Sequence, residues 1–445
     1  MAAFDLPPQD MPIDISIVMP CLNEAKALGA CISNARGALT HLREKHGLSG
    51  EIIVADNGSS DGSQQIAFGL GARVVAVPRR GYGAALIGGF AAARGRFLVM
   101  GDADGSYDFG DAVAMVEALI DGADLCMGSR FKGGIKLGAM PWKNRYIGNP
   151  ALTAVLNVFF HAGVSDAHCG LRALTKSCFE RLKLNGFGME FASEMVIKAA
   201  LLGERIVEVP ATLSPDLRGR PPHLRPWRDG WRHLRYLLML SPSWVFAIPA
   251  GLGTLLAFAV LLPAAEVWIA GEDQARLFFG NYWVILAGSV LDISHIAAVL
   301  ALACHLYGIR EGFRKPGPWT AALSRWLTLE TMLLAGLLAM ISGLGILLWV
   351  FAYWSAHDFG RIASVFPAVA GTSLLTMGIQ NMLGGFLLAI VGGNEAQFLA
   401  RLARWSLGGQ AGSQNGAEEL KGLKSPETGP FRTESSNSGA LEMQD

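Results

Sequence analysis

The chain has 445 residues, of which 51% are hydrophobic, and its 37 basic residues balance 37 acidic ones. Zero net charge excludes the strongly basic surface typical of nucleic-acid-binding proteins, so no nucleic acid is expected as a partner. Mean hydropathy is +0.34, an average over two parts of the chain that differ. Residues 1 to about 235 mix polar and apolar residues, whereas long uncharged runs dominate from Trp244 onward.

Apolar, β-branched runs alternate with helical patterns along the first 130 residues. Repeated strand–helix pairs are typical of an α/β domain with a mostly parallel central sheet covered on both faces. No Gly-x-Gly-x-x-Gly follows the first run and no Walker loop is present, so a bound nucleotide is not expected to be held in dinucleotide or P-loop fashion. The expected strands are residues 14–20, 51–59, 72–78, 96–102 and 124–130.

Acidic and amide side chains follow three of these expected strands. In open α/β sheets, ligands collect beyond the carboxyl ends of the strands. A pair of aspartates there suits a hard divalent cation and the phosphates of a nucleotide, although any single acid is equally explained as a helix cap. The residues are Asn23 and Glu24 after the first strand, Asp56 after the second, and Asp102 and Asp104 after the fourth.

Four long uncharged runs in the second half of the chain each meet the length of about 20 apolar residues that crosses a bilayer. They predict four transmembrane helices within residues 243–395. Asp292 lies midway along the second run, and we expect His295 and polar groups on neighbouring helices to satisfy it. The runs are residues 244–265, 277–307, 331–354 and 362–393.

Charge distribution predicts the orientation of these helices. The first 14 residues contain no basic residue and no apolar core, so they are not a signal peptide. Arginines and lysines precede the first run and lie between the second and third, whereas the opposite loops carry only Arg276 and Arg361. The positive-inside rule then predicts a multi-pass protein of the inner or plasma membrane, with the front domain and both termini cytoplasmic.

The segment before the first membrane helix has the pattern of an interfacial helix. Over residues 226–242, one apolar stripe is flanked by arginines that can face lipid phosphates. The alternative is a plain basic flank that obeys charge topology. Residues 408–445 are rich in Gly, Ser, Glu and Pro, and we expect them to be disordered. The stripe consists of Trp227, Trp231, Leu234 and Leu238.

Five motifs in order along residues 14 to about 240 resemble one family. They are SIVMPCLNEA, EIIVADNGSSDGS, RRGYGAALIGGFAAARGRFLVMGDADGSYDF, MGSRF and SDAHCGLRAL. Together they are similar to family 2 glycosyltransferases of the GT-A fold, in the branch of dolichol-phosphate mannose synthase and bacterial polyprenyl-phosphate glycosyltransferases. The resemblance implies a cytoplasmic GT-A nucleotide-sugar-binding domain over residues 1–225, followed by the α-helical membrane domain of four spans.

The same resemblance implies the roles of the residues on the nucleotide-sugar side. Asp102 and Asp104 would hold Mg²⁺ or Mn²⁺, with Asp104 the more direct ligand. Asn57 stands where many members carry a second aspartate, which leaves the nucleotide open between UDP and GDP. The implied nucleotide-sugar-binding residues are Pro20, Asn23, Glu24, Asp56, Arg80, Gly81, Asp102, Ala103 and Glu190.

The acceptor side is expected to carry cations. A lipid phosphate has a second pKa of about 6 and is largely dianionic at cytoplasmic pH, so it needs positive charge instead of a general base. Arginine suits phosphate well because its guanidinium binds two oxygens at once. Asp166 is expected to act as a base or to orient Arg172 and His168. The catalytic residues are then Asp104, Asp166, Arg130 and Arg172, and the acceptor-phosphate residues are Arg145, Arg218 and Arg220.

These observations predict a metal-dependent, inverting transfer of a hexose from a nucleotide sugar to a polyprenyl phosphate, either dolichyl or undecaprenyl. A processive polysaccharide synthase is the nearest rival, but its Gln-x-x-Arg-Trp motif is absent before the membrane runs. A glycolipid synthase that acts on a diacylglycerol would need Asp166 as a true base. A non-catalytic partner of a lipid-sugar flippase is a further alternative, and assembly into a homo-oligomer is left open.

Overall fold

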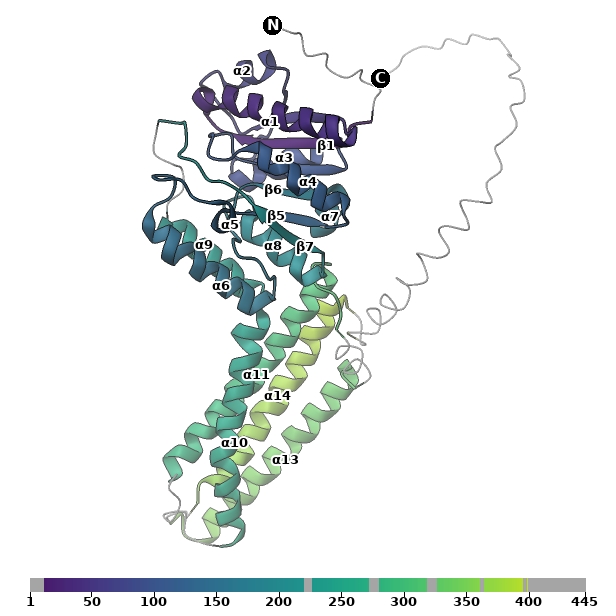
Figure 1. The fold of residues 1–445 in the computed structure, drawn as a ribbon. Coiled ribbons are helices and arrows are strands. Elements are labelled where there is room, and N and C mark those ends of the chain that lie inside the picture. The colour runs from purple at the N-terminus through teal and green to yellow at the C-terminus, as the bar shows by residue number, and fades with distance from the viewer. Residues whose placement is uncertain are drawn as a thin grey trace, which may run out of the picture.

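A computed structural model describes residues 12–219, 226–271, 280–317, 326–360, 364–394 and 398. An α/β domain stands on one end of a bundle of four long helices (Figure 1). The fold class predicted from the sequence, a mostly parallel α/β domain followed by four apolar helices, is therefore confirmed. Arg220 and the segment 408–445 lie outside the described residues.

The α/β domain contains a seven-stranded sheet in the order β3-β2-β1-β4-β6-β5-β7. All paired neighbours are parallel except β6, which runs antiparallel to both β4 and β5. No strand was expected at β6, because four residues that begin with an arginine give no apolar run. The strands are β1 (Ile15–Cys21), β2 (Gly50–Asp56), β3 (Arg73–Ala76), β4 (Phe97–Met100), β5 (Leu125–Ser129), β6 (Arg172–Thr175) and β7 (Ile206–Pro210).

Helices cover both faces of the sheet. Side chains alternate along a strand, so Ile17 of β1 packs into the core that contains α1 and α4, whereas Val18 packs into the core with α3 and α8. Both residues are at most 1% exposed. The helices are α1 (Ala25–His46), α2 (Ser63–Gly69), α3 (Tyr82–Ala92), α4 (Ala112–Ile120), α5 (Arg130–Gly133), α6 (Asn149–Phe160), α7 (Lys176–Leu182), α8 (Phe191–Leu202) and α9 (Pro226–Met239).

The sheet order brings the expected functional loops together. Strand β1 lies between β2 and β4 and is parallel to both, so the carboxyl ends of these three strands share one edge of the sheet. Pro20 near the end of β1 pairs with Ala55 of β2, one residue before Asp56. The Asp102 loop follows β4 at the same edge. The predicted convergence of these loops thus follows from strand order.

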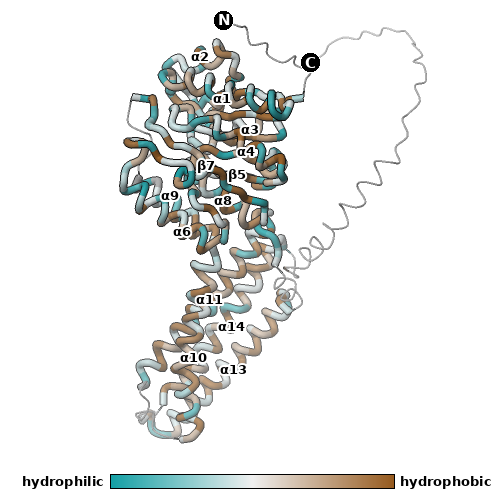
Figure 2. The backbone as a smooth tube through the Cα atoms, viewed as in Figure 1, coloured by the Kyte–Doolittle hydropathy of each residue, from teal (hydrophilic) through white to brown (hydrophobic). Residues whose placement is uncertain are grey.

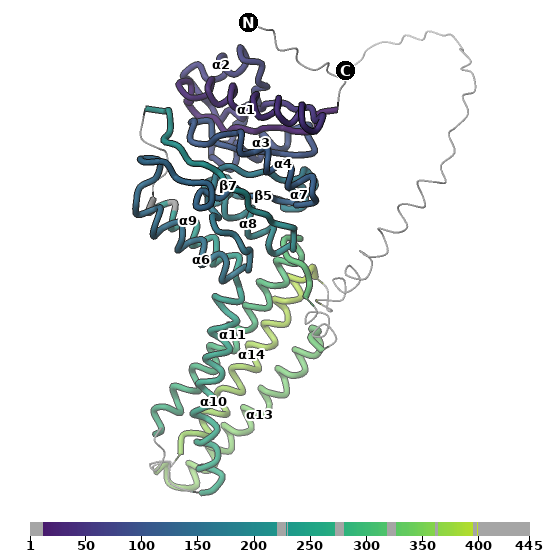
Figure 3. Tube along the Cα trace, viewed as in Figure 1, coloured from purple at the N-terminus to yellow at the C-terminus, as the bar shows by residue number. Residues whose placement is uncertain are grey.

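The four long helices are α10 (Ile248–Ile269), α11 (Asn281–Arg310), α13 (Leu329–Ala356) and α14 (Phe366–Gly392). A short turn of helix, η3 (Ser243–Ala247), extends α10, and each helix is long and apolar enough to cross a membrane. Figure 2 shows their largely apolar character beside the mixed α/β domain. The last helix, α14, runs between α11 and α13 (Figure 3) and contacts both.

Glycines allow α13 and α14 to approach closely. A Cβ atom built on Gly378 would lie 2.6 Å from the Gly336 carbonyl oxygen, and one on Gly343 would lie 2.6 Å from the Gly371 carbonyl oxygen. The paired positions recur every seven residues on both helices, which is the repeat of a left-handed helix pair. Close backbone contact through small residues is a main source of helix association in a bilayer.

Polar side chains also connect α11 to α14. His295 Nδ1 lies 2.9 Å from Gln380 Oε1, so the expected partner of Asp292 pairs with α14. Asp292 Oδ1 is buried and has no hydrogen-bond partner among the described residues. The mid-membrane carboxylate therefore sits at the α11–α14 contact, but His295 does not satisfy this oxygen as expected.

The glycine contact predicts a specific instability. Replacing Gly378→Leu should force α13 and α14 apart and lower the melting temperature of the detergent-purified protein, because the new side chain meets the backbone of α13. Gly345→Leu on α13 is the matched control, since no atom lies within 4 Å of a Cβ built there. Thermal unfolding followed by a thiol-reactive dye measures both variants. Equal melting temperatures would contradict the proposed contact.

Candidate active site

The loops after β1 and β2 are tied to each other by side chains that follow the two strands. Asn23 has a left-handed backbone (φ 60°), and its Oδ1 accepts a hydrogen bond from the Ser60 backbone N–H at 2.8 Å. Asp56 is 2% exposed and accepts hydrogen bonds from the backbone N–H groups of Gly58 and Ser59. Both predicted residues therefore lie at the shared edge, where they also fix the shape of the second loop.

The segment after β3 is held in place by Asn57. The Asn57 amide donates to the Val77 and Arg79 carbonyls at 3.0 and 2.7 Å, and its Oδ1 accepts from the Gly81 N–H at 2.7 Å. Gly81 has φ 141°, which favours glycine, and the following residues begin α3. Arg80 is exposed beside this turn. Asn57 thus positions the backbone at Arg80 and Gly81.

The Asp-x-Asp turn lies directly after β4. Asp102 Oδ1 accepts a hydrogen bond from the Tyr82 hydroxyl at 3.0 Å. Burial, with the neighbouring Asp104 charge, raises the pKa of Asp102 to about 6. Asp104 is 4% exposed, and its Oδ1 accepts from the Ser106 N–H at 2.9 Å. Ala103 between them is buried, so the turn presents two carboxylates in a poorly hydrated place.

Arg218 neutralises part of this negative charge. Its Nη2 contacts Asp104 Oδ2, and its Nη1 lies 3.5 Å from Glu24 Oε1. The backbone holds it there, because the Leu217 N–H donates to the Asp104 carbonyl at 2.8 Å. Arg218 was predicted to bind the acceptor phosphate, and in this structure it lies with the carboxylates of the nucleotide side.

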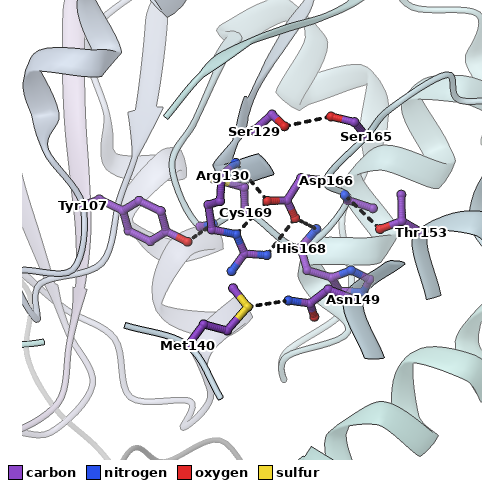
Figure 4. Close-up of polar contacts among 12 residues, drawn as sticks. Tyr107, Ser129, Arg130, Met140, Asn149, Thr153, Ser165, Asp166, His168 and Cys169 are labelled. Atoms are coloured by element: carbon purple, nitrogen blue, oxygen red, sulfur yellow. Dashed lines mark hydrogen bonds and ion pairs between the residues drawn. The ribbon is translucent and has the colours of Figure 1, made fainter. Parts of the chain in front are cut away.

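A second centre is the buried ion pair of Arg130 and Asp166 (Figure 4). Arg130 Nε and Nη2 donate to the two Asp166 oxygens, each at 2.7 Å. The backbone N–H groups of Arg130 and His168 also donate to this carboxylate, at 3.1 and 3.3 Å. Asp166 is 0% exposed; burial by itself would lower the pKa of Arg130, but Tyr107 and the ion pair with Asp166 together raise it.

The turn before β6 joins the two centres. The Gly170 N–H donates to the Tyr107 hydroxyl at 2.8 Å, and a Cβ atom built on Gly170 would lie 2.7 Å from Asp102 Oδ2. Only glycine fits this approach without displacing the carboxylate. The Asp-x-Asp turn and the Arg130–Asp166 pair are therefore neighbours in one site, at the place where antiparallel β6 enters the sheet.

Two family models match the chain. Residues 16–183 match the model described as glycosyl transferase family 2, and residues 302–392 match the glycosyltransferase family 2 C-terminal transmembrane region. The low-salt glycan biosynthesis hexosyltransferase Agl6 of Haloferax volcanii is 33% identical over 388 residues, which cover 86% of this chain and 90% of that protein. The chain belongs to glycosyltransferase family 2.

Other similar proteins match the front domain of this glycosyltransferase. A dolichol-phosphate mannosyltransferase of Pyrococcus furiosus is 30% identical over 46% of this chain and 58% of its own length. A glucosyl-3-phosphoglycerate synthase from Mycobacterium tuberculosis, solved with Mn²⁺, UDP and glucosyl-3-phosphoglycerate, is 24% identical over 51% of this chain and 78% of its own, with a TM-score of 0.38. The enzyme is thus a family 2 glycosyltransferase with a GT-A-like mixed sheet and four apolar helices.

Arg172 of the glycosyltransferase lies beneath the site. It is 0% exposed, and its guanidinium donates to the carbonyls of Cys169, Ala192 and Ala167 at 2.6–2.9 Å. Asp166 was expected to orient Arg172, but the two hydrogen bonds of Asp166 to a guanidinium go to Arg130. The arrangement favours Arg172 as the residue that fixes the turn before β6, with no surface to offer a phosphate.

The remaining predicted residues lie around these centres. Glu190 begins α8, and its Oε2 is buried with no partner in the described part of the chain, which leaves this oxygen available to a ligand hydroxyl. Glu194, one turn later on α8, pairs with Lys198 at 2.7 Å and is 0% exposed. Arg145 is half-buried in the short helix η2 (Asn144–Gly148) that leads into α6.

Sequence reasoning missed two side chains that shape the site, Tyr82 and Tyr107, and considered Asn57 only for the choice of nucleotide. Tyr82 and Tyr107 hydrogen-bond to Asp102 and to the Gly170 backbone, and Asn57 holds the turn at Gly81. Each lies within a motif that was singled out for its neighbours. No local signal distinguishes these residues, because their partners are distant in sequence.

The carboxylates of Asp102 and Asp104 are suited to bind one divalent cation together with the phosphates of a substrate. Within the described ranges, no group of three or more His, Cys, Asp or Glu side chains is arranged to hold a metal ion alone. The Arg218 guanidinium against Asp104 shows that this carboxylate attracts a cation. Mg²⁺ is commonly bound by one or two carboxylates together with substrate phosphates and water. Asp102 and Asp104 suit that kind of site.

If Arg218 and a metal ion compete for Asp104, removing the arginine should tighten metal binding. We expect Arg218→Ala to bind Mn²⁺ about tenfold more tightly without nucleotide, measured by the electron paramagnetic resonance signal of free Mn²⁺. Arg94→Ala, which removes an exposed arginine near the opposite end of β4, is the charge-matched control. Equal Mn²⁺ affinity in Arg218→Ala and the unmodified enzyme would contradict the competition.

Proposed function

We propose that this glycosyltransferase transfers a hexose from UDP-hexose or GDP-hexose to the phosphate of a membrane polyprenyl phosphate, with inversion at the anomeric carbon. The similar Pyrococcus furiosus protein is named a dolichol-phosphate mannosyltransferase, and the Haloferax volcanii protein a hexosyltransferase. The observation that carries the proposal is the fully occupied Asp166 carboxylate beside Arg130.

A hydroxyl acceptor would need a general base, and Asp166 is poorly placed to be one. An ionised carboxylate has about four acceptor positions, and Asp166 accepts four hydrogen bonds, three of them from Arg130 and one from the His168 backbone. Protonating it would leave a buried guanidinium unpaired. A phosphate acceptor needs no base, so this arrangement favours a lipid phosphate over a diacylglycerol hydroxyl.

In the proposed reaction, an oxygen of the acceptor phosphate attacks the anomeric carbon as the bond from that carbon to the donor diphosphate breaks. The nucleoside diphosphate leaves with the bonding electron pair, and the dianionic acceptor transfers no proton. Arg130 would hold the acceptor phosphate through Nη1, the nitrogen that its ion pair does not use. Glu190 Oε2 would accept a hydrogen bond from a sugar hydroxyl.

The donor side would bind the nucleotide at the shared edge of β1, β2 and β4. Asp56 and Glu24 would receive the base and ribose, and the turn at Arg80 and Gly81 would pass the diphosphate. Asp104 and Asp102 would hold Mg²⁺ or Mn²⁺, which neutralises charge on the departing diphosphate. Arg218, displaced from Asp104, would then be close enough to contact that diphosphate.

An apolar surface beside the site supports delivery of the acceptor from a membrane. Helices α6 and α9 contact each other at the end of the α/β domain nearest the bundle (Figure 1). Large apolar side chains on the 137–147 segment and on α9 are strongly exposed, as expected for groups that enter the headgroup region. They are Leu137, Trp142, Tyr146, Ile147, Trp231 and Met239, with exposed fractions of 56–99%.

The predicted interfacial helix has two faces in the structure. His233 and Leu237 of α9 are at most 6% exposed against the α/β domain, whereas Trp231 is 59% exposed. Arg145 lies on η2 beside the exposed apolar side chains, at a height suited to a lipid headgroup. We propose that α9 lies in the membrane interface on the cytoplasmic side, in agreement with the positive-inside rule.

The test is an acceptor and donor panel. The purified protein in nanodiscs is incubated with UDP- and GDP-hexoses, Mg²⁺ or Mn²⁺, and dolichyl phosphate, undecaprenyl phosphate or diacylglycerol, and lipid products are identified by mass spectrometry. A polyprenyl-phosphate hexose product supports the proposal. A glycosylated diacylglycerol as the sole product, or no transfer to any lipid from any donor, would overturn it.

Asp104→Ala should abolish this transfer, with at least a hundredfold loss of rate, because it removes the carboxylate nearest the proposed metal. Far-ultraviolet circular dichroism and the melting temperature should stay close to those of the unmodified protein. Wild-type turnover by Asp104→Ala in saturating Mg²⁺ or Mn²⁺ would remove Asp104 from the proposed metal site.

Asp166→Asn should destabilise the enzyme by about 3 kcal/mol, because it leaves the buried Arg130 charge without its counter-ion. Chemical denaturation of the detergent-solubilised protein measures this free energy. Lys132→Ala is the control: Lys132 pairs with Glu208 but its side chain is 48% exposed, so the loss should stay below about 1 kcal/mol. A stable Asp166→Asn enzyme whose pH–rate profile has lost its acidic limb, the rise of rate with pH, would instead identify Asp166 as a base.

A further inference from the structure

His168 carries two polar atoms that the fold does not use. Both ring nitrogens are buried, and neither has a hydrogen-bond partner among the described residues. A neutral imidazole offers one donor and one acceptor nitrogen, and folded proteins rarely leave either without a partner. His168 therefore costs the ligand-free enzyme stability that an apolar ring of the same size would not cost.

The surroundings of His168 carry excess positive charge. Burial, His233, Arg130 and Arg172 together lower the pKa of His168, so its ring is neutral. Arg130 is paired with Asp166, whereas the guanidinium of Arg172 donates to the backbone carbonyls of Cys169, Ala192 and Ala167. A buried region with this balance favours an anionic ligand.

The ring of His168 is held by α9. It meets the ring of His233 edge to face, with centroids 4.9 Å apart and planes at 89°. His233 is itself fixed, since its Nδ1 lies 2.8 Å from Ser193 Oγ on α8. The ring of His233 thus has a polar partner, whereas the neighbouring ring of His168 has none within the described ranges.

The side chains next to His168 can give way to a ligand. Figure 4 draws His168, Asn149 and Met140 on the same side of Asp166. The Asn149 amide donates to the Met140 sulfur at 3.4 Å, and a thioether is a weak acceptor. Met140 is also flexible, so both side chains can move without loss of a strong contact.

We infer that the His168 imidazole donates a hydrogen bond to an anionic oxygen of the acceptor phosphate that Arg130 binds. This inference deepens the proposed function and rests on it. His168 would then be an acceptor-binding residue, distinct from the Asp166 that precedes it in the same loop and only holds Arg130. This role would explain why the fold leaves the ring nitrogens of His168 unused: they would hydrogen-bond to the lipid phosphate when it binds.

The inference predicts that one variant, His168→Phe, keeps its thermal stability but binds the acceptor more weakly. His168→Phe should melt at the same temperature as the unmodified enzyme or higher, while the KM for a short-chain polyprenyl phosphate rises about tenfold or more. The KM for the nucleotide sugar should change less than twofold. His168→Gln, which keeps an N–H donor, should recover part of the loss.

His233→Phe is the matched control. It removes an imidazole of the same pair but leaves the Ser193 hydroxyl without its partner, so its melting temperature should fall. A fall of the same size in His168→Phe would show that the ring has a structural partner, which overturns the inference. Unchanged KM for the polyprenyl phosphate in His168→Phe would also overturn it.

Binding measurements identify which phosphate His168 serves. Calorimetry with farnesyl phosphate and, separately, with a nucleoside diphosphate should show weaker binding of the first alone in His168→Phe. Weaker binding of the nucleoside diphosphate alone would overturn the assignment to the acceptor. If the unmodified enzyme neither binds nor glycosylates any polyprenyl phosphate, the proposed function fails first. If it does both and His168→Phe equals it, only this inference fails.

Discussion

The ion pair between Arg130 and Asp166 organises the acceptor half of the site. An arginine that is only 7% exposed requires a counter-ion, and Asp166 provides it with bidentate geometry and no exposed surface. The pairing leaves Asp166 no free acceptor position for a proton. The contact that makes the fold tolerate a buried guanidinium is therefore also the basis of the proposed preference for an acceptor that needs no deprotonation.

Antiparallel β6 brings this pair to the nucleotide side. Because β6 lies between β4 and β5, the turn before it passes beside the Asp-x-Asp turn after β4, at the close approach of Gly170 to Asp102. A purely parallel sheet would bring another carboxyl end to this edge instead. The inserted strand thus places the Arg130–Asp166 pair next to the Asp-x-Asp carboxylates, which is the arrangement that the proposed transfer between two phosphates would use.

Membrane attachment acts on the same site through α9. One face of this helix packs on α8 through His233 and Leu237, and its other face exposes Trp231. The α11 end is fixed to the domain as well, since Arg314 Nη2 donates to the Leu240 carbonyl at 3.2 Å. Direct contacts therefore connect α8, α9 and the end of α11.

Local patterns in the sequence determined where five strands and the four apolar helices lie along the chain and which acids follow the strands. Each of these features depends on residues within a few positions of one another. Which residues far apart in the sequence pair with each other was decided only by the tertiary structure. Asp166 pairs with Arg130 and not with Arg172, Arg218 contacts Asp104 across 114 residues, and the two ring nitrogens of His168 have no partner in the described parts of the chain. Burial and the insertion of β6 decide these pairings, and neither is encoded by spacing along the chain.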